Sequence, residues 1–455
     1  MAGLFVPAIG RACRLLDPGA GIGSLSSGFL ERCITGDLNF EKIEIAAFEI
    51  DILLHEELKN TFAAYSKQIP FAHEIIGADF IEEAVSQIQF NYGNKFTHAI
   101  LNPPYKKIGS GSRHRLLLRQ VGIETVNLYS AFLALSISLM APGGQLVAII
   151  PRSFCNGPYY RPFREFLLKR CAIRHMHLFD SRNQAFKDDD VLQENVIIML
   201  ENGGQQGDVT VTTSTDDSFA DLATHTHRFD RIVFPDDPEH FIHVPTSQKQ
   251  SAIELITAIR HSLIDIGISV STGPVVDFRI KKHLRGMPEQ GTIPLLYPGH
   301  FNGQSIEWPK AGLKKPNAIH RNAETEKWLY PTGFYCVVRR FSSKEEKRRI
   351  VARVVQPGIF ADAEVLGFEN HLNVLHEHKH GLPETLAYGL TAFLNTSAVD
   401  ENFRRFNGHT QVNAADLKLM KYPSRDALIA LGKWAMRCGE PTQVMIDKQL
   451  ENLNA

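Results

Sequence analysis

Residues 14–202 alternate between short β-branched or apolar segments and segments with apolar residues at helical spacing. This alternation is the feature that most limits the possible fold, because strands joined by helices pack as a doubly wound, mostly parallel sheet with helices on both faces. We expect residues 195–202 to run antiparallel to the strand before them. The expected strands are 14–19, 43–51, 73–80, 96–104, 145–151, 173–179 and 195–202, and the expected helices are Ser24–Cys33, 52–67 and 127–144.

The alternation stops in a polar stretch, 203–227, that is rich in Ser, Thr and Asp. We interpret this stretch as a strand and a loop at a domain boundary, which divides the chain into residues 1–220 and 221–455. Beyond about residue 245 short strands, Pro/Gly turns and a final amphipathic helix, Ser424–Glu440, indicate an α+β domain.

The whole chain has 49 basic and 50 acidic side chains, so bulk charge does not indicate a nucleic-acid partner. Two windows differ. Residues 106–187 hold 13 Lys/Arg against three acids, and residues 279–353 hold 16 against six, enough for a polyanion-binding face if they converge. No apolar run is long enough to cross a membrane, and six scattered cysteines fit reduced thiols.

A glycine-rich turn, Asp17-Pro18-Gly19-Ala20-Gly21-Ile22-Gly23, joins the first strand to the first helix. Glycines there allow a nucleotide to approach the backbone at the carboxyl end of the sheet. The spacing is neither GxGxxG nor a P-loop, and the leading acid suits a positively charged cofactor group better than a phosphate.

Two further acids follow neighbouring strands. Glu49 ends the second strand, where a carboxylate can accept hydrogen bonds from both hydroxyls of a ribose. Asp79, which we place at the end of the third strand, can accept from an exocyclic amine of adenine. Three acids at successive strand ends therefore predict a nucleoside site.

The fourth strand ends in Asn102-Pro103-Pro104-Tyr105, the sharpest motif of the chain. The two prolines remove backbone donors, so the turn presents carbonyl acceptors. The Asn102 amide oxygen and the Pro103 carbonyl can both accept from one planar NH₂ group, and Tyr105 can stack on the ring that carries it. This arrangement directs a nitrogen lone pair toward an electrophile beside the glycine turn.

DPGAGIG, the acid of AFEID, the acid of GADF and NPPY, in this order, resemble the S-adenosylmethionine-dependent N6-adenine DNA methyltransferases of the γ class. AIIPRSF (148–154) resembles the strand and loop after the catalytic motif of this class, and LFDSRNQAFKDDDVLQENVIIM (178–199) resembles its later motif. NPPYKKI and FNGHTQVNAADLK (406–418) are similar to the PstI/BsuBI-type restriction–modification methyltransferases. The resemblance covers most of the chain. It implies a Rossmann-like catalytic domain followed by a C-terminal target-recognition domain.

The resemblance also implies a mechanism, an adenine-specific DNA methyltransferase reaction. A flipped adenine donates from N6 to Asn102 and Pro103, Tyr105 and Phe186 enclose the base, and the methyl group moves directly without a metal. Asp17, Gly19, Gly21, Gly23, Glu49 and Asp79 hold S-adenosylmethionine. The implied partners are double-stranded DNA, with CTGCAG as the site that the likeness suggests, and a cognate endonuclease. The implied location is the cytoplasm and nucleoid of a bacterium.

For DNA contacts we expect Lys106 and Lys107 beside the motif and Arg339, Arg340, Lys347 and Arg348 along the backbone. The family carries, before the glycine turn, a helix that binds the methionine portion of the cofactor. Met1–Phe5 resembles the tail of that helix, so we expect an added upstream segment to tighten cofactor binding.

Two alternatives stay open. NPPY also occurs in methyltransferases that act on RNA bases or on glutamine amides of proteins, and a non-catalytic DNA-specificity protein would carry a degenerate methylase domain. A fused endonuclease domain is a further possibility, but the sequence shows no clear endonuclease motif. The His-rich segment 370–380 invites a metal site, but we expect a strand and a loop of the second domain there.

Overall fold

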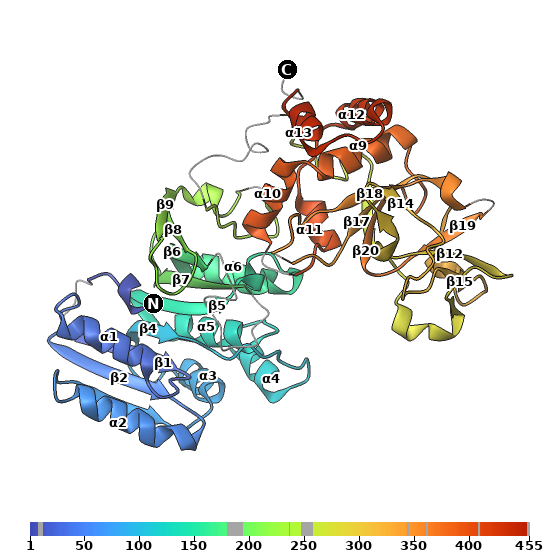
Figure 1. The fold of residues 1–455 in the computed structure, drawn as a ribbon. Helices are drawn as coiled ribbons and strands as arrows, with labels where there is room; N and C mark the ends of the chain where they lie inside the picture. The colour runs from blue at the N-terminus through green and yellow to red at the C-terminus, as the bar shows by residue number, and fades with distance from the viewer. Residues whose placement is uncertain are drawn as a thin grey trace. The chain divides into compact units, whose positions relative to one another are not determined.

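A computed structural model describes residues 1–7, 12–179, 194–235, 237–246, 258–343, 345–360, 363–407 and 410–452. The chain forms two compact units, Met1–Gln248 and Lys249–Ala455 (Figure 1). Among the described residues no helix is both long and apolar enough to cross a membrane. All six cysteines are free thiols, and five of them are buried.

The first unit is built on a nine-stranded sheet with the strand order β3-β2-β1-β4-β5-β7-β6-β8-β9. β1 to β5 run parallel, and β7 is antiparallel to both β5 and β6. The sheet confirms the predicted doubly wound α/β fold, including the antiparallel strand at 195–202. The strands are β1 (Ala12–Pro18), β2 (Lys42–Phe48), β3 (Ala72–Ile76), β4 (Phe96–Leu101), β5 (Met140–Pro151), β6 (Cys171–Phe179), β7 (Asn195–Asn202), β8 (Val209–Ser214) and β9 (Ala223–His227).

Helices cover both faces of this sheet. Leu15 and Leu16 are adjacent on β1 and both fully buried, one in each of two hydrophobic clusters. The first two helices pack into one cluster and the other four into the other. A strand buried on both faces needs consecutive apolar residues, which is the pattern that the sequence shows. The helices are α1 (Ser24–Ile34), α2 (His55–Tyr65), α3 (Phe80–Phe90), α4 (Arg113–Gln120), α5 (Leu128–Leu139) and α6 (Arg161–Arg170).

Several predicted elements were too long. The strands predicted over 43–51 and 96–104 end at Phe48 and Leu101, and the helix predicted over 52–67 ends at Tyr65. The third strand ends at Ile76, not at residue 80, because Asp79 already caps the next helix, α3. The helix predicted over 127–144 ends at Leu139, and β5 begins at Met140 with an irregular register against β4. The sequence analysis did not predict α3, α4 or α6.

The first unit extends beyond the boundary predicted at residue 220. β9 pairs antiparallel with β8 at the edge of the sheet, and Ile232 and Ile242 are fully buried in its core. Residues 221–235 and 237–246 therefore belong to the first unit by their packing. The functional names of the two domains stay predictions.

The second unit has the α+β architecture that we expected. Its larger sheets have the strand orders β10-β20-β17-β18 and β11-β15-β12-β19-β16, and β13 pairs with β14. The strands are β10 (Ser269–Thr272), β11 (Leu284–Arg285), β12 (Thr292–Leu296), β13 (Phe301–Asn302), β14 (Ser305–Ile306), β15 (Ala318–His320), β16 (Leu329–Pro331), β17 (Tyr335–Arg339), β18 (Ala352–Val355), β19 (Val365–Phe368) and β20 (Leu372–His376). The helices are α9 (Glu384–Leu394), α10 (Ser397–Phe406), α11 (Ala414–Leu419), α12 (Arg425–Cys438) and α13 (Gln443–Glu451).

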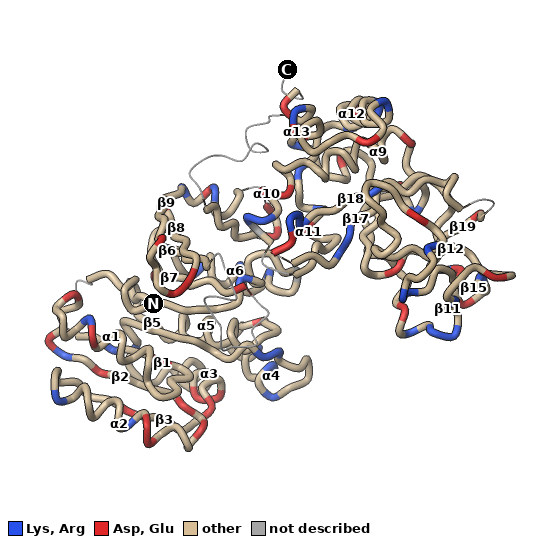
Figure 2. Tube along the Cα trace, in the orientation of Figure 1, with Lys and Arg blue, Asp and Glu red and all other residues tan. Residues whose placement is uncertain are grey.

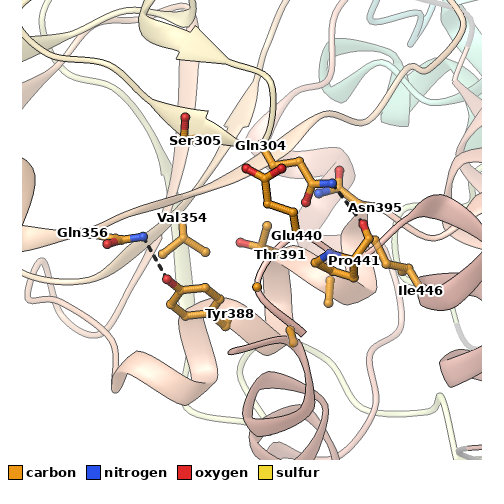
Figure 3. A pocket seen from close by; sticks show the side chains of 13 residues that line it. Gln304, Ser305, Val354, Gln356, Tyr388, Thr391, Asn395, Glu440, Pro441 and Ile446 are labelled. Carbon is orange, nitrogen blue, oxygen red and sulfur yellow. Dashed lines mark hydrogen bonds between the residues drawn. The ribbon is translucent and has the colours of Figure 1, made fainter. Parts of the chain in front are cut away.

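The predicted final amphipathic helix corresponds to α12, which Ser424 caps. The His-rich segment contains β20 and a tight turn in which Glu377 pairs with His380, as expected of a strand and a loop. A pocket of this unit is lined by β14, β18, α9 and the α12–α13 connection (Figure 3). Its side-chain amides hydrogen-bond within the protein, Gln356 to the Tyr388 hydroxyl and Gln304 to the Pro441 carbonyl.

α9 and α12 touch backbone to backbone through two glycines. A Cβ atom on Gly432 would lie 1.7 Å from the Thr385 carbonyl oxygen, and one on Gly389 would lie 1.9 Å from the Leu428 carbonyl oxygen. Neither neighbour is a side chain that can turn away. The two helices therefore pack at this distance only because both positions lack a side chain.

We expect Gly432→Ala to lower the free energy of unfolding of the second unit by about 3 kcal/mol, because the helices must separate to admit the methyl group. Gly358→Ala is the matched control, since a Cβ there meets nothing within 4 Å. All three tryptophans, Trp308, Trp328 and Trp434, lie in this unit, so urea unfolding followed by tryptophan fluorescence measures the difference. Equal stability of the two variants would contradict the close contact.

Candidate active site

The glycine turn after β1 is fixed to the end of β2. The Gly19 and Ala20 N–H groups both donate to the Phe48 carbonyl at 2.8 Å. Gly19, Gly21 and Gly23 have φ of 81°, 57° and 89°, a region that side chains disfavour. A Cβ on Gly23 would also lie 2.8 Å from Leu58 Cδ1 of α2. The turn thus needs these glycines for its own shape.

Asp17 is fully buried under this turn. Its Oδ2 accepts a 2.6 Å hydrogen bond from the Ser26 hydroxyl of α1, while its Oδ1 is buried with no hydrogen-bond partner among the described residues. Burial raises the pKa of Asp17 to about 7, and the nearby charge of Glu49 acts in the same direction. The structure therefore brings Asp17 and Glu49 close enough to interact electrostatically.

Glu49 holds the middle of the turn. Its Oε2 accepts from the Gly21 N–H and its Oε1 from the Asp51 N–H, both at 2.8 Å. Each carboxylate oxygen retains a second lone pair for a ligand. Ile50, Ile52 and Leu53 follow with largely exposed side chains. The sequence analysis missed this exposed apolar surface. The run of aliphatic residues directly after Glu49, an acid at a strand end, could have predicted it.

Asp79 lies where β3 leads into α3. Its Oδ1 accepts from the Ile81 and Glu82 N–H groups at 2.8 and 3.1 Å, which is helix capping. Its Oδ2 lies 3.0 Å from His114 Nε2 of α4. The sequence carries no signal for His114, because it is distant along the chain and belongs to a helix that was not predicted.

The Asn102–Tyr105 motif follows β4, the neighbour of β1 in the sheet, so both turns lie at the same carboxyl edge. Asn102 and Pro104 are exposed and Pro103 is buried. The Tyr105 hydroxyl lies 3.2 Å from both Asn102 Oδ1 and the Ile149 carbonyl oxygen of β5, either of which can accept its proton. These contacts fix the orientation of the motif on the sheet.

Two buried tyrosines support the Tyr105 ring. Tyr129 meets it edge to face at 6.2 Å, and Tyr160 stacks on Tyr129 at 5.8 Å. The Tyr129 hydroxyl lies 3.1 Å from the Ser153 hydroxyl, and Asn127 donates to the Tyr160 hydroxyl. Neither tyrosine was predicted, because the aromatic support comes from α5 and from the segment after β5. Phe186, predicted to enclose the base, lies outside the described residues.

The predicted DNA-contacting cations differ in their surroundings. Lys106 and Lys107 are exposed next to the motif, and their ammonium groups have no partner among the described residues; the same holds for Lys347. The three arginines instead bind protein groups within the second unit: Arg339 pairs with Glu346, Arg340 donates to Gln411 Oε1 and the Asn370 carbonyl, and Arg348 donates to Gln443 Oε1 and the Thr396 carbonyl. These guanidinium groups hold the fold together, so their predicted role in DNA binding has little support from their geometry.

Comparison with known proteins identifies the family of this chain. Residues 32–186 match the model of the Eco57I restriction-modification methylase family. The type II methyltransferase M.BsuBI of Bacillus subtilis is 56% identical over 97% of this chain and 88% of its own length. M.PstI of Providencia stuartii is 42% identical over 98% and 89%. The chain belongs to the type II DNA methyltransferases of restriction–modification systems.

Two more distant comparisons cover very different shares of the chain. A tRNA1(Val) (adenine(37)-N6)-methyltransferase of Shewanella woodyi is 27% identical over 44% of this type II methyltransferase and 81% of its own length. The solved type IIL restriction–modification enzyme MmeI, in complex with DNA, covers 97% of this chain and 69% of its own with a TM-score of 0.58 and 11% identity. The MmeI likeness shows a shared fold over both units.

The methyl donor of these methyltransferases is S-adenosylmethionine, and the carboxyl edge fits it. The cofactor carries a sulfonium and an ammonium group, and Asp17 Oδ1 is a buried carboxylate oxygen without a partner among the described residues. Such an atom costs free energy unless a ligand satisfies it. We therefore keep the Gly19–Gly23 turn, Asp17, Glu49 and Asp79 as the predicted cofactor residues.

We expect cofactor affinity to rise about tenfold between pH 6 and pH 8, because a cationic ligand favours the ionised form of a carboxyl with a pKa near 7. Binding should release about half a proton at pH 7. Isothermal titration calorimetry in buffers of different ionisation enthalpy measures both quantities. Asp17→Asn should bind more weakly and abolish the extra proton release, and unchanged proton release in this variant would refute the role.

Proposed function

We propose that this methyltransferase transfers a methyl group to N6 of adenine within a specific double-stranded DNA sequence. The observation that carries the proposal is the placement of two carbonyl acceptors, Asn102 Oδ1 and the Pro103 carbonyl, at the end of β4 beside the glycine turn of β1. An exocyclic NH₂ group has two protons for these two acceptors. Thymine has no such group.

The proposed step is a direct displacement. S-adenosylmethionine supplies an electrophilic methyl group. Hydrogen bonds from the N6 amino group to Asn102 Oδ1 and the Pro103 carbonyl raise the electron density of the N6 lone pair. This lone pair would form the new nitrogen–carbon bond as the carbon–sulfur bond of the donor breaks, leaving S-adenosylhomocysteine, and one N6 proton then leaves to solvent. No side-chain nucleophile is needed, so positioning and electrostatics carry the catalysis.

The adenine must leave the duplex to reach this edge, because N6 is not accessible to the methyl group while the base is stacked and paired. Tyr105 offers an aromatic face that Tyr129 already supports. Phe186 is the predicted second face. Unstacking costs a few kcal/mol, which contacts with the enclosed base offset.

The relatives support the substrate in two parts. The tRNA relative, named for methylation of adenine N6, matches part of this chain, whereas M.BsuBI and M.PstI match nearly all of it. We assign N6 chemistry to the first unit, which carries the Asn102–Tyr105 motif, and DNA selection to the second unit. A cognate restriction endonuclease that cuts the same site, with CTGCAG as the first candidate, and action on DNA of the bacterial nucleoid belong to the same proposal.

The direct test is to incubate the protein with S-adenosylmethionine labelled in its methyl group and with mixed-sequence plasmid DNA. Digestion of the DNA to nucleosides should give labelled N6-methyl-2′-deoxyadenosine. Sequencing of the modified positions should identify one recurrent site. Label in RNA or protein, or in cytosine, would overturn the proposal. No label at all would favour a non-catalytic specificity protein.

Variants of the motif give a finer prediction. We expect Asn102→Ala and Tyr105→Ala to lower the methylation rate by about 10³-fold while leaving DNA affinity within a factor of three, because each removes a group from the reacting base. Tyr105→Phe keeps the ring and loses only the 3.2 Å contacts to Asn102 and Ile149, so its rate should lie between those of the wild type and Tyr105→Ala. Single-turnover methylation and fluorescence anisotropy measure the two quantities. Full activity of Asn102→Ala would remove it from the site.

A further inference from the structure

Two loops of the second unit, residues 277–289 and 310–317, are joined side by side. The Lys315 ammonium lies 2.8 Å from Asp277 Oδ2, and the Asn317 N–H lies within 3.2 Å of the carbonyl oxygens of both Arg285 and Gly286. Figure 2 shows Lys and Arg following one another along the loop that leads into β11. These contacts place basic residues from two separate stretches of sequence next to each other.

Asn317 makes this junction rigid. Its buried side chain donates from Nδ2 to the Gly286 carbonyl at 2.8 Å, while its Oδ1 accepts from the Lys310 N–H at 2.8 Å and lies 2.9 Å from His300 Nε2. A buried amide with its hydrogen bonds made fixes the groups around it. The loops are therefore held in place before any ligand binds.

The acids near these loops already have basic partners. The four pairs are Asp277 with Lys315, Glu289 with Arg285, Glu324 with Lys282, and Glu369 with His371. Arg279, Lys281 and Lys314 are exposed, and none has a carboxylate within 4.0 Å among the described residues. The uncompensated charge of the joined loops is therefore positive.

An aromatic ring stands among these cations. Phe278 leaves 65% of its surface exposed, and the Arg279 guanidinium lies 5.5 Å from the centre of its ring. Burial of an aromatic side chain stabilises a folded protein, and Phe278 loses most of that stabilisation at this position. Ile280, two residues further on, is buried, so this loop does pack an apolar side chain into the core. Phe278 is not the side chain that it packs.

A second arginine–phenylalanine pair lies on an adjoining strand end. Phe341 is 42% exposed, and the Arg340 guanidinium lies 5.8 Å from its ring centre. The two pairs are connected through the backbone, because Asn370 N–H donates to the Val275 carbonyl and Arg340 N–H donates to the His371 carbonyl. The Arg340 guanidinium already donates to Gln411 Oε1 and the Asn370 carbonyl, so this second pair adds an exposed ring but no free cation. At the Phe278 loop an exposed ring lies beside cations that have no carboxylate partner among the described residues, which suits the phosphates and stacked bases of a nucleic acid.

We propose that Phe278 is an apolar wedge that enters the target DNA duplex, with Arg279, Lys281 and Lys314 on the flanking phosphates. This inference rests on the proposed function, since it names how the second unit engages the DNA that the first unit methylates. Insertion of an apolar side chain opens a base step, and cations beside it neutralise the phosphates that the distortion brings together. A base-flipping enzyme gains from such a distortion because it must unstack a base.

The wedge is tested with Phe278→Ala and Phe278→Leu on a short duplex that contains the site identified by methylation sequencing. We expect Phe278→Ala to bind this duplex roughly tenfold more weakly, the size of one lost stacking contact, with an unchanged salt dependence. Phe278→Leu keeps an apolar side chain and should regain most of the affinity. A mismatch in the opened step should restore binding of Phe278→Ala, because the mismatch lowers the unstacking cost.

The cations are tested by their salt dependence. From about 50 to 200 mM salt, Lys281→Ala and Lys314→Ala should each reduce the slope of log affinity against log salt by about 1. Lys433→Ala is the matched control, since Lys433 is an exposed lysine of α12 without a partner among the described residues. Equal slopes for all three variants would overturn the phosphate contacts.

Two measurements separate this inference from the proposed function. If the wild-type protein transfers no label to DNA, the proposed function is wrong, whatever DNA affinity the loop variants have. If the wild-type protein methylates DNA but Phe278→Ala changes neither the DNA affinity nor the fluorescence of 2-aminopurine in the duplex, only the wedge is wrong. Tighter binding to a duplex RNA of the same sequence would overturn DNA as the ligand. Tryptophan fluorescence checks that each variant is folded.

Discussion

The end of β2 holds the glycine turn in its working shape, and the candidate site depends on that attachment. One carbonyl, that of Phe48, accepts from two successive N–H groups of the turn, and the next residue, Glu49, accepts from a third. The turn therefore cannot move without loss of three hydrogen bonds to a neighbouring strand. Because β4 flanks β1 on its other side, the same sheet that fixes the turn also fixes the Asn102–Tyr105 motif relative to it.

Much of the first unit could be predicted from sequence because its signals are local. Leu15 and Leu16 side by side indicate a strand buried on both faces, and the glycines, Glu49 and the motif each follow a strand directly. The errors also have local causes. From sequence alone GADF fits either the polar end of a strand or the cap of a helix, and only the capping bonds of Asp79 separate the two interpretations. His114, Tyr129 and Tyr160 needed tertiary contacts that no spacing predicts.

Charge in the second unit shows the limit of reasoning from composition. Residues 279–353 count as one basic window in the sequence, yet the fold uses its arginines in two ways. Arg339, Arg340 and Arg348 bind carboxylate, amide and carbonyl oxygens of the protein, as a planar guanidinium with five donors does well. Arg279, Lys281 and Lys314, by contrast, are exposed and have no carboxylate partner among the described residues. Only a list of partners distinguishes a structural arginine from one that is available to a ligand.

The tyrosine of the motif has a consequence for substrate choice. The Tyr105 hydroxyl can donate to Asn102 Oδ1 or to the Ile149 carbonyl, and the Asn102 amide oxygen has a second lone pair for a ligand. In the proposed reaction an amino group donates to that lone pair while the tyrosine contact stays in place. A base that presents a carbonyl would bring an acceptor against an acceptor. The proposed site therefore favours a base that donates a hydrogen bond over one that only accepts.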